Sequence, residues 1–338
     1  MIHRTAQRWQ TETWQESLSN AIRCPRQLRQ LLKLEQLPFN DGILASEAFS
    51  VMVPRPYLNR IKPGDINDPL LRQVMPDNRE LIKLPAYSKD PLQENDCTPL
   101  PGLIHKYHGR ILLVTSGGCA INCRYCFRRH FDYNSNTHNR THLEKTIEYI
   151  TDNPEISEVI LSGGDPLAAK DNYLKDLCES LGNLPQLKRL RIHTRLPIVI
   201  PQRINAECLD WLSTSKLPVV MVLHCNHPNE IDQEVHKAIT DLKHANVTML
   251  NQSVLLRSVN DDVDTLIDLS ETLFASGVLP YYLHLLDPVE GSSLFEVDEI
   301  QARKLVGALI AQLPGYLVPK FVKECAKTAS KFPIAPIF

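Results

Sequence analysis

The chain has 338 residues, of which 43% are hydrophobic and 22% are charged, and its formal net charge is −2. These are ordinary values for a globular protein, and the length suits one large α/β domain with an appendage. The sequence has no long basic run and no apolar stretch near the roughly 18 residues of a membrane span, which argues against nucleic-acid and membrane partners. Residues 1–20 carry no secretory signal, so we expect a cytoplasmic protein.

The first predicted region, residues 1–104, is mostly helical and irregular. Apolar residues at helical spacing, such as Trp14, Leu18 and Ile22, predict helices over residues 1–37. Residues 38–104 are rich in proline, so helices there must be short and joined by extended links. We expect this region to pack on the main domain, where it is a candidate contact surface for a homo-oligomer.

The second region, residues 105–312, alternates apolar β-rich runs with amphipathic segments such as Glu230–Ala245. Most of these runs have centres about 30 residues apart, the length of a strand–helix repeat, and such repeats build a parallel sheet. Six repeats fit a partial (β/α)6 barrel better than a closed eight-stranded one. The predicted strands are Ile111–Thr115, Val159–Ser162, Leu190–Thr194, Val219–His224, Val247–Val254 and Tyr281–Leu286.

Three cysteines follow the first predicted strand, in the stretch Cys119-Ala-Ile-Asn-Cys123-Arg-Tyr-Cys126. A 4Fe–4S cluster normally takes four protein thiolates, so three thiolates on one loop would leave one iron open for another ligand. A structural zinc site takes four ligands, usually as two pairs, and no second pair follows. The spacing therefore favours an iron–sulfur cluster over zinc.

Polar residues also follow the other predicted strands, at the strand ends where parallel α/β barrels carry their chemistry. The stretch Ser162-Gly163-Gly164-Asp165 lets the backbone approach a ligand closely, although it equally suits a simple tight turn. The last segment, residues 313–338, includes Lys327 and Lys331 among its four lysines, and the default interpretation of either is surface exposure. Further polar candidates at strand ends are His193, Arg195, His224, Gln252 and Asp287.

The CxxxCxxC spacing resembles the radical S-adenosylmethionine (SAM) superfamily. Over roughly residues 90–335, the order of several further motifs resembles the lysine 2,3-aminomutase family, and most closely its branch that serves elongation factor P. The motifs are Lys106–Arg110, Cys126–Arg129, Leu161–Asp165, Pro201–Ile204, Asn226–Glu230, Asn251–Arg257 and Ser330–Pro333.

This resemblance implies a 4Fe–4S cluster, SAM and pyridoxal 5′-phosphate (PLP) as cofactors. It assigns the attachment of PLP to Lys331 in the short C-terminal segment, with Lys327 as the competing anchor, and it assigns the glycine-rich turn to SAM. The chain stops at Phe338 without the cysteine-bearing extension of catabolic relatives, so no zinc site is expected. The remaining assignments are Cys119, Cys123 and Cys126 to the cluster, Lys106, Tyr107 and Arg110 to the PLP phosphate, and Ser162, Gly163, Gly164, Asp165, His224 and Gln252 to cofactor binding.

The resemblance further implies isomerisation of (S)-α-lysine to (R)-β-lysine. Arg128 would bind the substrate carboxylate, and Asp287 and Glu324 would bind the far ammonium. Glu324 stands where catabolic relatives have an aspartate, so recognition of the substrate side chain is expected to differ. The reaction breaks an unactivated C–H bond, which a side-chain base cannot do, and therefore requires a radical generated by the cofactors.

The implied partners are free L-lysine, an external one-electron donor, and, downstream, a β-lysine ligase and elongation factor P. Two alternatives remain at this point. One is a 2,3-aminomutase for another amino acid, such as glutamate or arginine; two acids in the pocket favour a cationic side chain over glutamate. The other is a non-catalytic iron–sulfur redox protein, which would leave Lys331 and Arg128 without a role.

Overall fold

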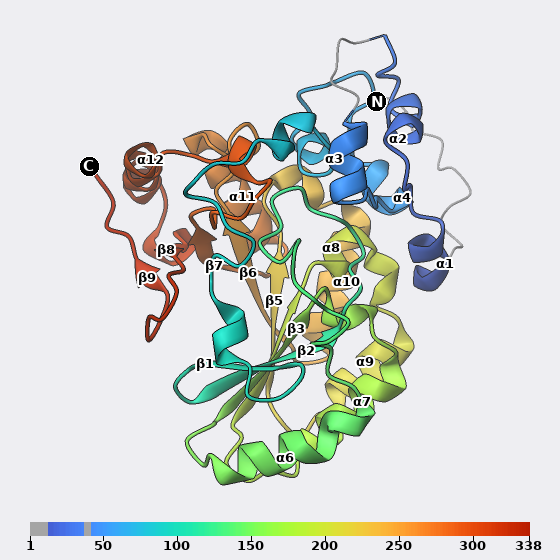
Figure 1. Ribbon diagram of the computed structural model, residues 1–338, viewed down its shortest axis with the longest axis vertical. Helices are drawn as coiled ribbons and strands as arrows, with labels where there is room; N and C mark the ends of the chain where they lie inside the picture. The colour runs from blue at the N-terminus through green and yellow to red at the C-terminus, as the bar shows by residue number, and fades with distance from the viewer. Residues whose placement is uncertain (1–12, 37–41) are drawn as a thin grey trace.

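The computed structural model describes residues 13–36 and 42–338. Its centre is a nine-stranded sheet in which the strands follow one another in chain order (Figure 1). Strands β2 to β8 are mutually parallel, whereas β1 and β9 run antiparallel to their neighbours at the two edges. The strands are β1 (Leu103–Tyr107), β2 (Arg110–Ser116), β3 (Glu158–Gly163), β4 (Arg189–Thr194), β5 (Val219–His224), β6 (Thr248–Val254), β7 (Leu279–His284), β8 (Lys320–Lys323) and β9 (Phe332–Pro333).

The six predicted strands correspond to β2 through β7, with bounds that differ by a few residues. The predicted partial α/β barrel is therefore confirmed. The C-terminal segment adds a seventh parallel strand, β8, which pairs with β7 from Tyr282↔Lys320 onward. Its short sequence Lys320-Phe-Val-Lys323 gives too little pattern for sequence reasoning to identify it.

Helices connect the parallel strands, and the predicted helix at Glu230–Ala245 is found as α10. The side chain of Asp232 caps α10 by accepting a hydrogen bond from the Val235 backbone N–H at 2.9 Å. These helices are α6 (Leu143–Asp152), α7 (Asp171–Leu181), α8 (Leu196–Val199), α9 (Ala206–Ser213), α10 (Gln233–His244), α11 (Val263–Ala275) and α12 (Glu299–Gln312). Short 3₁₀ turns are η2 (Asn78–Leu81), η3 (Glu94–Cys97), η4 (Arg140–His142), η5 (Pro166–Ala168), η6 (Pro201–Arg203), η7 (Pro228–Glu230), η8 (Ser293–Phe295) and η9 (Gly315–Leu317).

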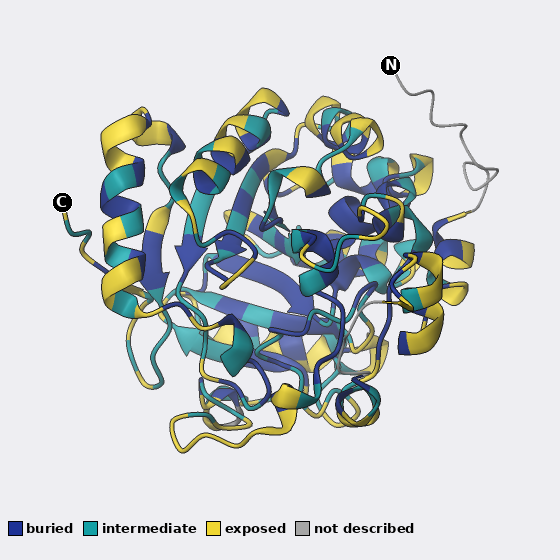
Figure 2. Cartoon of the chain, turned by 90° about the horizontal axis from the view of Figure 1, so that it is seen from above, coloured by how far each residue is buried: buried dark blue, intermediate teal, exposed yellow. Residues whose placement is uncertain are grey.

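The strands are buried in the middle of the molecule, and the outward faces of the surrounding helices are exposed (Figure 2). Every residue of β3 is buried, as expected for a parallel strand covered on both sides. Each fully buried leucine, isoleucine or valine contributes roughly 1.5–3 kcal/mol relative to exposure. This packing makes the sheet a rigid frame for the residues at its strand ends.

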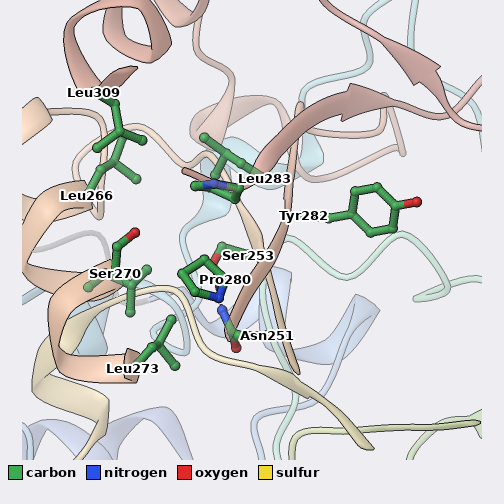
Figure 3. Close-up of a pocket in the computed structure, with 11 residues that line it drawn as sticks. Asn251, Ser253, Leu266, Ser270, Leu273, Pro280, Tyr282, Leu283 and Leu309 are labelled. Carbon is green, nitrogen blue, oxygen red and sulfur yellow. Dashed lines mark hydrogen bonds between the residues drawn. The ribbon is translucent and has the colours of Figure 1, made fainter. Parts of the chain in front are cut away.

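The alternation of side chains along β6 and β7 separates a packed outer face from an inner face. On the outer side a small pocket of about 10 Å³ lies between these strands and α11 and α12, and its lining includes Leu266, Ser270, Leu309 and Ser253 (Figure 3). The Tyr282 ring points away from this cluster. The opposite, inner face carries Gln252 and Tyr282, which line a much larger cavity.

The N-terminal region differs in part from its prediction. Helices occur within residues 13–36, but Ile22 pairs with Val53 in an isolated β-bridge and Pro25 starts a new helix, because proline fits the first helical turn. The part of the predicted helical region before residue 13, and residues 37–41, lie outside the described residues. The elements are α1 (Trp14–Ser19), α2 (Pro25–Leu31), α3 (Ile43–Ala48), α4 (Arg55–Leu58) and α5 (Pro69–Arg72).

This region holds the cysteine loop through a buried ion pair. Arg124, between the second and third cysteines, donates two hydrogen bonds to Glu80, at 2.9 and 2.7 Å, and one to the Phe49 carbonyl at 2.6 Å. Arg129 donates to the same carboxylate at 2.8 Å. Breaking a buried pair leaves an uncompensated charge, so these contacts fix the loop firmly. Within residues 13–36 and 42–338, no helix combines the length and the apolar character needed to cross a membrane.

Candidate active site

One cavity of about 860 Å³ opens at the C-terminal ends of the parallel strands. The strand ends are the place where the sequence predicts the chemistry, and the fold brings all of the predicted site residues to this cavity. Its lining includes Lys106, Tyr107, Arg110, Cys119, Cys123, Cys126, Arg128, Ser162, Gly163, Gly164, Asp165, His224, Gln252, Asp287, Glu324 and Lys331.

The three cysteines lie on the loop that follows β2, and the Cys126 N–H donates to the Cys123 carbonyl at 3.0 Å. Burial raises the pKa of the Cys119 and Cys126 thiols, the latter to about 11, and the neighbouring thiolates add to the effect. Among the described residues, no three His, Cys, Asp or Glu side chains converge tightly enough for a single metal ion. A cubane cluster binds each thiolate to a different iron, so it does not require that convergence.

Two glycines after β3 let that turn approach the cysteine loop. A Cβ at Gly164 would lie 2.5 Å from the Gly118 carbonyl oxygen and 3.1 Å from the Cys119 sulfur. Gly163 has φ +128°, and a Cβ there would lie 2.4 Å from the Ser116 carbonyl oxygen. Both close approaches exclude any larger residue. The glycines therefore bring the backbone of this turn directly beside the predicted cluster site.

Asp165 holds this turn rather than pointing freely into the cavity. Its carboxylate accepts hydrogen bonds from the Thr194 hydroxyl at 2.7 Å and from the backbone N–H groups of Leu167, Arg195 and Leu196 at 2.7–3.0 Å. These contacts tie the end of β3 to the end of β4. The Asp165 carboxylate is therefore used within the protein, where it fixes the position of the glycine-rich turn.

Arg195, at the end of β4, connects the cysteine loop to a buried polar network. It donates to the Cys123 sulfur and the Tyr125 hydroxyl, both at 2.6 Å, and to Gln73 and Glu230 at 2.7 and 2.8 Å. Its Nε is buried without a partner among the described residues. His193 Nε2, also on the cavity wall, is a second buried nitrogen without one. These orphaned groups fit a cavity built for a polar ligand.

Lys331 enters the cavity from the hairpin between β8 and β9. The antiparallel register Lys323↔Phe332 brings Glu324 and Lys331 to facing positions, and their side chains form an ion pair. Burial lowers the pKa of Lys331 to about 7, while the Asp287 carboxylate opposes the shift. The competing lysine, Lys327, sits at the hairpin tip with its side chain 73% exposed and does not line the cavity.

Cations surround Lys331 on the side of β1 and β2. Lys106 lies 3.3 Å from Glu324, and the Tyr107 hydroxyl donates to the same carboxylate at 3.2 Å. The Arg110 guanidinium rests 4.9 Å from the centre of the Tyr107 ring and makes no hydrogen bond or ion pair with a described residue. A free guanidinium beside a second cation suits a phosphate group. The donor set therefore fits a phosphorylated cofactor next to Lys331.

Asp287 is the acid that remains available in the cavity. Its carboxylate accepts no hydrogen bond from the described residues, although Lys331 and Lys106 lie within electrostatic reach. Burial raises its pKa to about 6, against the opposing effect of those two lysines. An acid in this state favours a cationic ligand, because a cation offsets the unfavourable burial of the carboxylate. Glu324, in contrast, already has Lys106, Tyr107 and Lys331 as partners.

The remaining predicted polar residues divide between ligand-facing and structural positions. Gln252 and His224 line the cavity, and burial lowers the pKa of His224 to about 3, so this imidazole is neutral. Asn251, adjacent to Gln252, points to the opposite face and bonds the backbone of Cys225. The polar groups of Asn251 are thus satisfied within the protein.

Sequence reasoning missed Glu94, which pairs with Arg128. Its carboxylate accepts from Arg128 Nε at 2.8 Å and Nη2 at 2.6 Å, and Arg128 Nη1 donates to the Ser162 hydroxyl at 3.2 Å. Burial alone would lower the pKa of Arg128, but Glu94 keeps it above the usual value. Glu94 lies in the proline-rich region with no motif around it, so the sequence offers no signal for this contact.

Several known proteins are similar to this chain. The family model described as the radical SAM superfamily matches residues 113–269. A solved structure, a radical SAM methyltransferase from Sphaerobacter thermophilus, aligns with TM-score 0.47 and 15% identity over 65% of this chain and 68% of its own. The three cysteines after the first parallel strand and the glycine turn beside them lie within the matched residues, so this part of the chain is a radical SAM domain. The fold class and the predicted 4Fe–4S cluster and SAM follow from this membership.

The particular family follows from closer relatives. An L-lysine 2,3-aminomutase of Haemophilus influenzae is 48% identical over 95% of both chains, and one of Escherichia coli strain K12 is 45% identical over 96% of this chain and 94% of its own. A protein of the same name from Clostridium subterminale is 34% identical over 96% of this chain and 78% of its own. The chain belongs to the lysine 2,3-aminomutase family, and it is an isomerase.

Proposed function

We propose that this enzyme converts (S)-α-lysine to (R)-β-lysine with PLP attached to Lys331, in addition to SAM and the cluster. The observation that carries the proposal is the position of Lys331, whose pKa is lowered to about 7, in the same cavity as the three cysteines. An amine must be unprotonated to attack the PLP aldehyde, and this pKa leaves about half of the amines reactive at pH 7. Lys327, exposed and outside the cavity, lacks this environment.

The residues around the cavity support distinct roles. Lys106, Tyr107 and Arg110 would hold the phosphate of PLP. Arg128 would bind the α-carboxylate of the substrate through charge-assisted hydrogen bonds. Asp287 would accept the ammonium at the far end of the side chain. With both ends held, C3 of the substrate has one orientation, and misplacement on the order of 1 Å can reduce the rate about 100-fold.

When bound, SAM and the reduced cluster would supply a carbon radical able to take a hydrogen atom from C3, and PLP would carry the substrate nitrogen while it moves from C2 to C3. The chain provides position and protection for this chemistry. The imidazole of His224, with its pKa at about 3, stays neutral. Gly163 and Gly164 offer backbone groups to SAM beside the cysteine loop, and Gln252 offers a side-chain amide from β6. The electron comes from an external one-electron donor.

Recognition of the side chain favours lysine over glutamate. Asp287 is an unpartnered acid within the described structure, and a second carboxylate brought against it would be repelled. Glu324, the predicted second acid, is engaged by Lys106, Tyr107 and Lys331. We therefore assign the ammonium chiefly to Asp287, with Glu324 oriented by its three partners. This division is consistent with the departure at Glu324 from the catabolic pattern.

An anaerobic assay tests the proposed reaction. Reconstituted protein with SAM, a reductant and L-lysine should yield β-lysine, resolved from α-lysine of equal mass by chromatography, and L-glutamate and L-arginine should react far more slowly. Cys123→Ala should lose the cluster absorbance and all turnover, whereas Lys327→Ala should match the parent protein. Faster conversion of glutamate or arginine would contradict lysine as the substrate. Absence of a borohydride-sensitive PLP absorbance band would contradict the role of Lys331.

We further propose that the product serves the modification of elongation factor P. The support is the resemblance in the motifs and the high identity to relatives of similar length. In a coupled assay with a β-lysine ligase and elongation factor P, the mass of the intact factor should increase by one lysyl unit. This increase should occur only when the present enzyme is included. Equal modification with α-lysine alone would contradict this destination for the product.

A further inference from the structure

Glu94 and Arg128 form a buried, doubly hydrogen-bonded pair in the wall of the cavity. Their side chains are 10% and 7% exposed, respectively. Glu94 begins η3, and its own backbone is anchored on both sides: its N–H donates to the Asp90 carboxylate at 3.1 Å, and its carbonyl accepts from the Thr98 hydroxyl at 2.9 Å. The backbone that carries the Glu94 side chain is therefore held in place independently of Arg128.

The guanidinium is fixed in orientation by these contacts. A guanidinium has five N–H donors in a planar fork. Nε and Nη2 bond Glu94, and Nη1 bonds the Ser162 hydroxyl. The ring centres of Phe127 and Phe131 lie 4.9 and 5.8 Å from the guanidinium carbon. Two N–H donors, one on Nη1 and one on Nη2, have no partner among the described residues, and Arg128 lines the cavity.

We propose that Glu94 is a positioning residue that orients Arg128 to receive the α-carboxylate of the substrate. The inference rests on the proposed function, in which Arg128 binds that carboxylate. By occupying one edge of the guanidinium, Glu94 restricts incoming carboxylates to the donors that remain. It also compensates the charge of a buried arginine when no substrate is bound.

The sign of a mutational effect separates this role from simple electrostatics. Glu94 is an anion near the place where the substrate carboxylate binds, so its charge alone weakens binding. Replacing it by a neutral residue would then tighten the binding of lysine. If the substrate must displace Glu94 from Arg128 in order to bind, a neutral replacement of Glu94 would likewise tighten the binding of lysine. If Glu94 instead orients the guanidinium, its replacement weakens binding, because the two free donors lose their alignment.

The test compares two substrates in the reconstituted holoenzyme: L-lysine, and L-lysinamide, which lacks the carboxylate. Glu94→Gln should raise KM for L-lysine by about 10- to 100-fold, the value of hydrogen bonds to charged groups, with a much smaller change in kcat. It should leave the already weak use of L-lysinamide unchanged. Asp96→Asn, an acid-to-amide change on the same 3₁₀ turn at a side chain 64% exposed, is the matched control and should change neither.

Glu94→Asp is a second variant, for the case in which Glu94→Gln does not fold. It keeps a carboxylate that balances the charge of Arg128, but it shortens the side chain by one methylene. It should raise KM for L-lysine but not for L-lysinamide, with cluster content and SAM affinity unchanged. Tighter or unchanged lysine binding in both variants would overturn the role of Glu94, and so would equal losses for the two substrates. If the parent enzyme does not distinguish L-lysine from L-lysinamide, the assignment of Arg128 fails first and the role of Glu94 falls with it.

Discussion

The environment of Lys331 predicts how fast PLP attaches at each pH. Burial lowers the pKa of this amine to about 7. At pH 7, about half of the amines are then unprotonated, compared with roughly one in 2,500 for an ordinary lysine of pKa about 10.4. The structure thus makes Lys331 roughly a thousandfold more available to an aldehyde at neutral pH.

The assay follows the incorporation of PLP into the apoprotein from pH 5.5 to 9.5, with borohydride trapping and peptide mass mapping. The rate should rise about tenfold per pH unit below pH 7 and level off above about pH 8. The Asp287 carboxylate favours the protonated amine, so Asp287→Asn should lower the pKa of Lys331 further and move the profile to lower pH. Lys327→Ala should not change it. A rate that still rises tenfold per unit at pH 9, or incorporation that survives Lys331→Ala, would refute this reasoning.

Two further predictions concern charge in the cavity and around the cysteine loop. The pKa of Asp287 is raised to about 6, so the affinity for lysine should fall as the pH drops through 6 and the carboxylate protonates. Asp287→Asn should remove this pH dependence and weaken lysine binding about 10- to 100-fold, while the affinity for SAM stays the same. Equilibrium binding of each ligand measures both effects. Equal loss of both ligands would make Asp287 structural. Glu80→Ala leaves Arg124 buried without its carboxylate and should lower the free energy of unfolding by about 3–5 kcal/mol in urea denaturation. Asp210→Ala, at an exposed pair with Lys175, should lower it by less than about 1 kcal/mol, and equal effects would show that the buried pair does not hold the loop.

The arrangement joins radical generation and substrate binding on one rigid frame. Seven parallel strands end at the same cavity, and the antiparallel hairpin of β8 and β9 carries Lys331 into it from the C-terminal side. The N-terminal region contributes Glu80 to the outside of the cysteine loop and Glu94 to the substrate side. A region in which the sequence indicates no chemistry therefore supplies two of the buried carboxylates on which the site depends.

Local sequence patterns were enough to predict the parallel strands of the sheet and the cysteine loop of the cluster. The β-rich apolar runs predicted six of the seven parallel strands, because strand burial and the length of the strand–helix repeat are properties of short windows. The cysteine loop is local as well, since Cys119, Cys123 and Cys126 lie on one turn of chain. The close approach of Gly164 to the Cys119 sulfur explains physically why that turn carries glycine.

Only the tertiary structure decided how distant residues share the cavity. Lys327 and Lys331 are four positions apart with similar surroundings in sequence, yet the register of the β8–β9 hairpin buries one and exposes the other. The pairing of Glu94 with Arg128 depends on the path of the chain between them, which no spacing rule encodes. The pKa values of Lys331 and Asp287 are likewise set by burial and by neighbours brought together through folding. Such effects arise from contacts across long sequence separations, so they become visible only when the sheet has assembled.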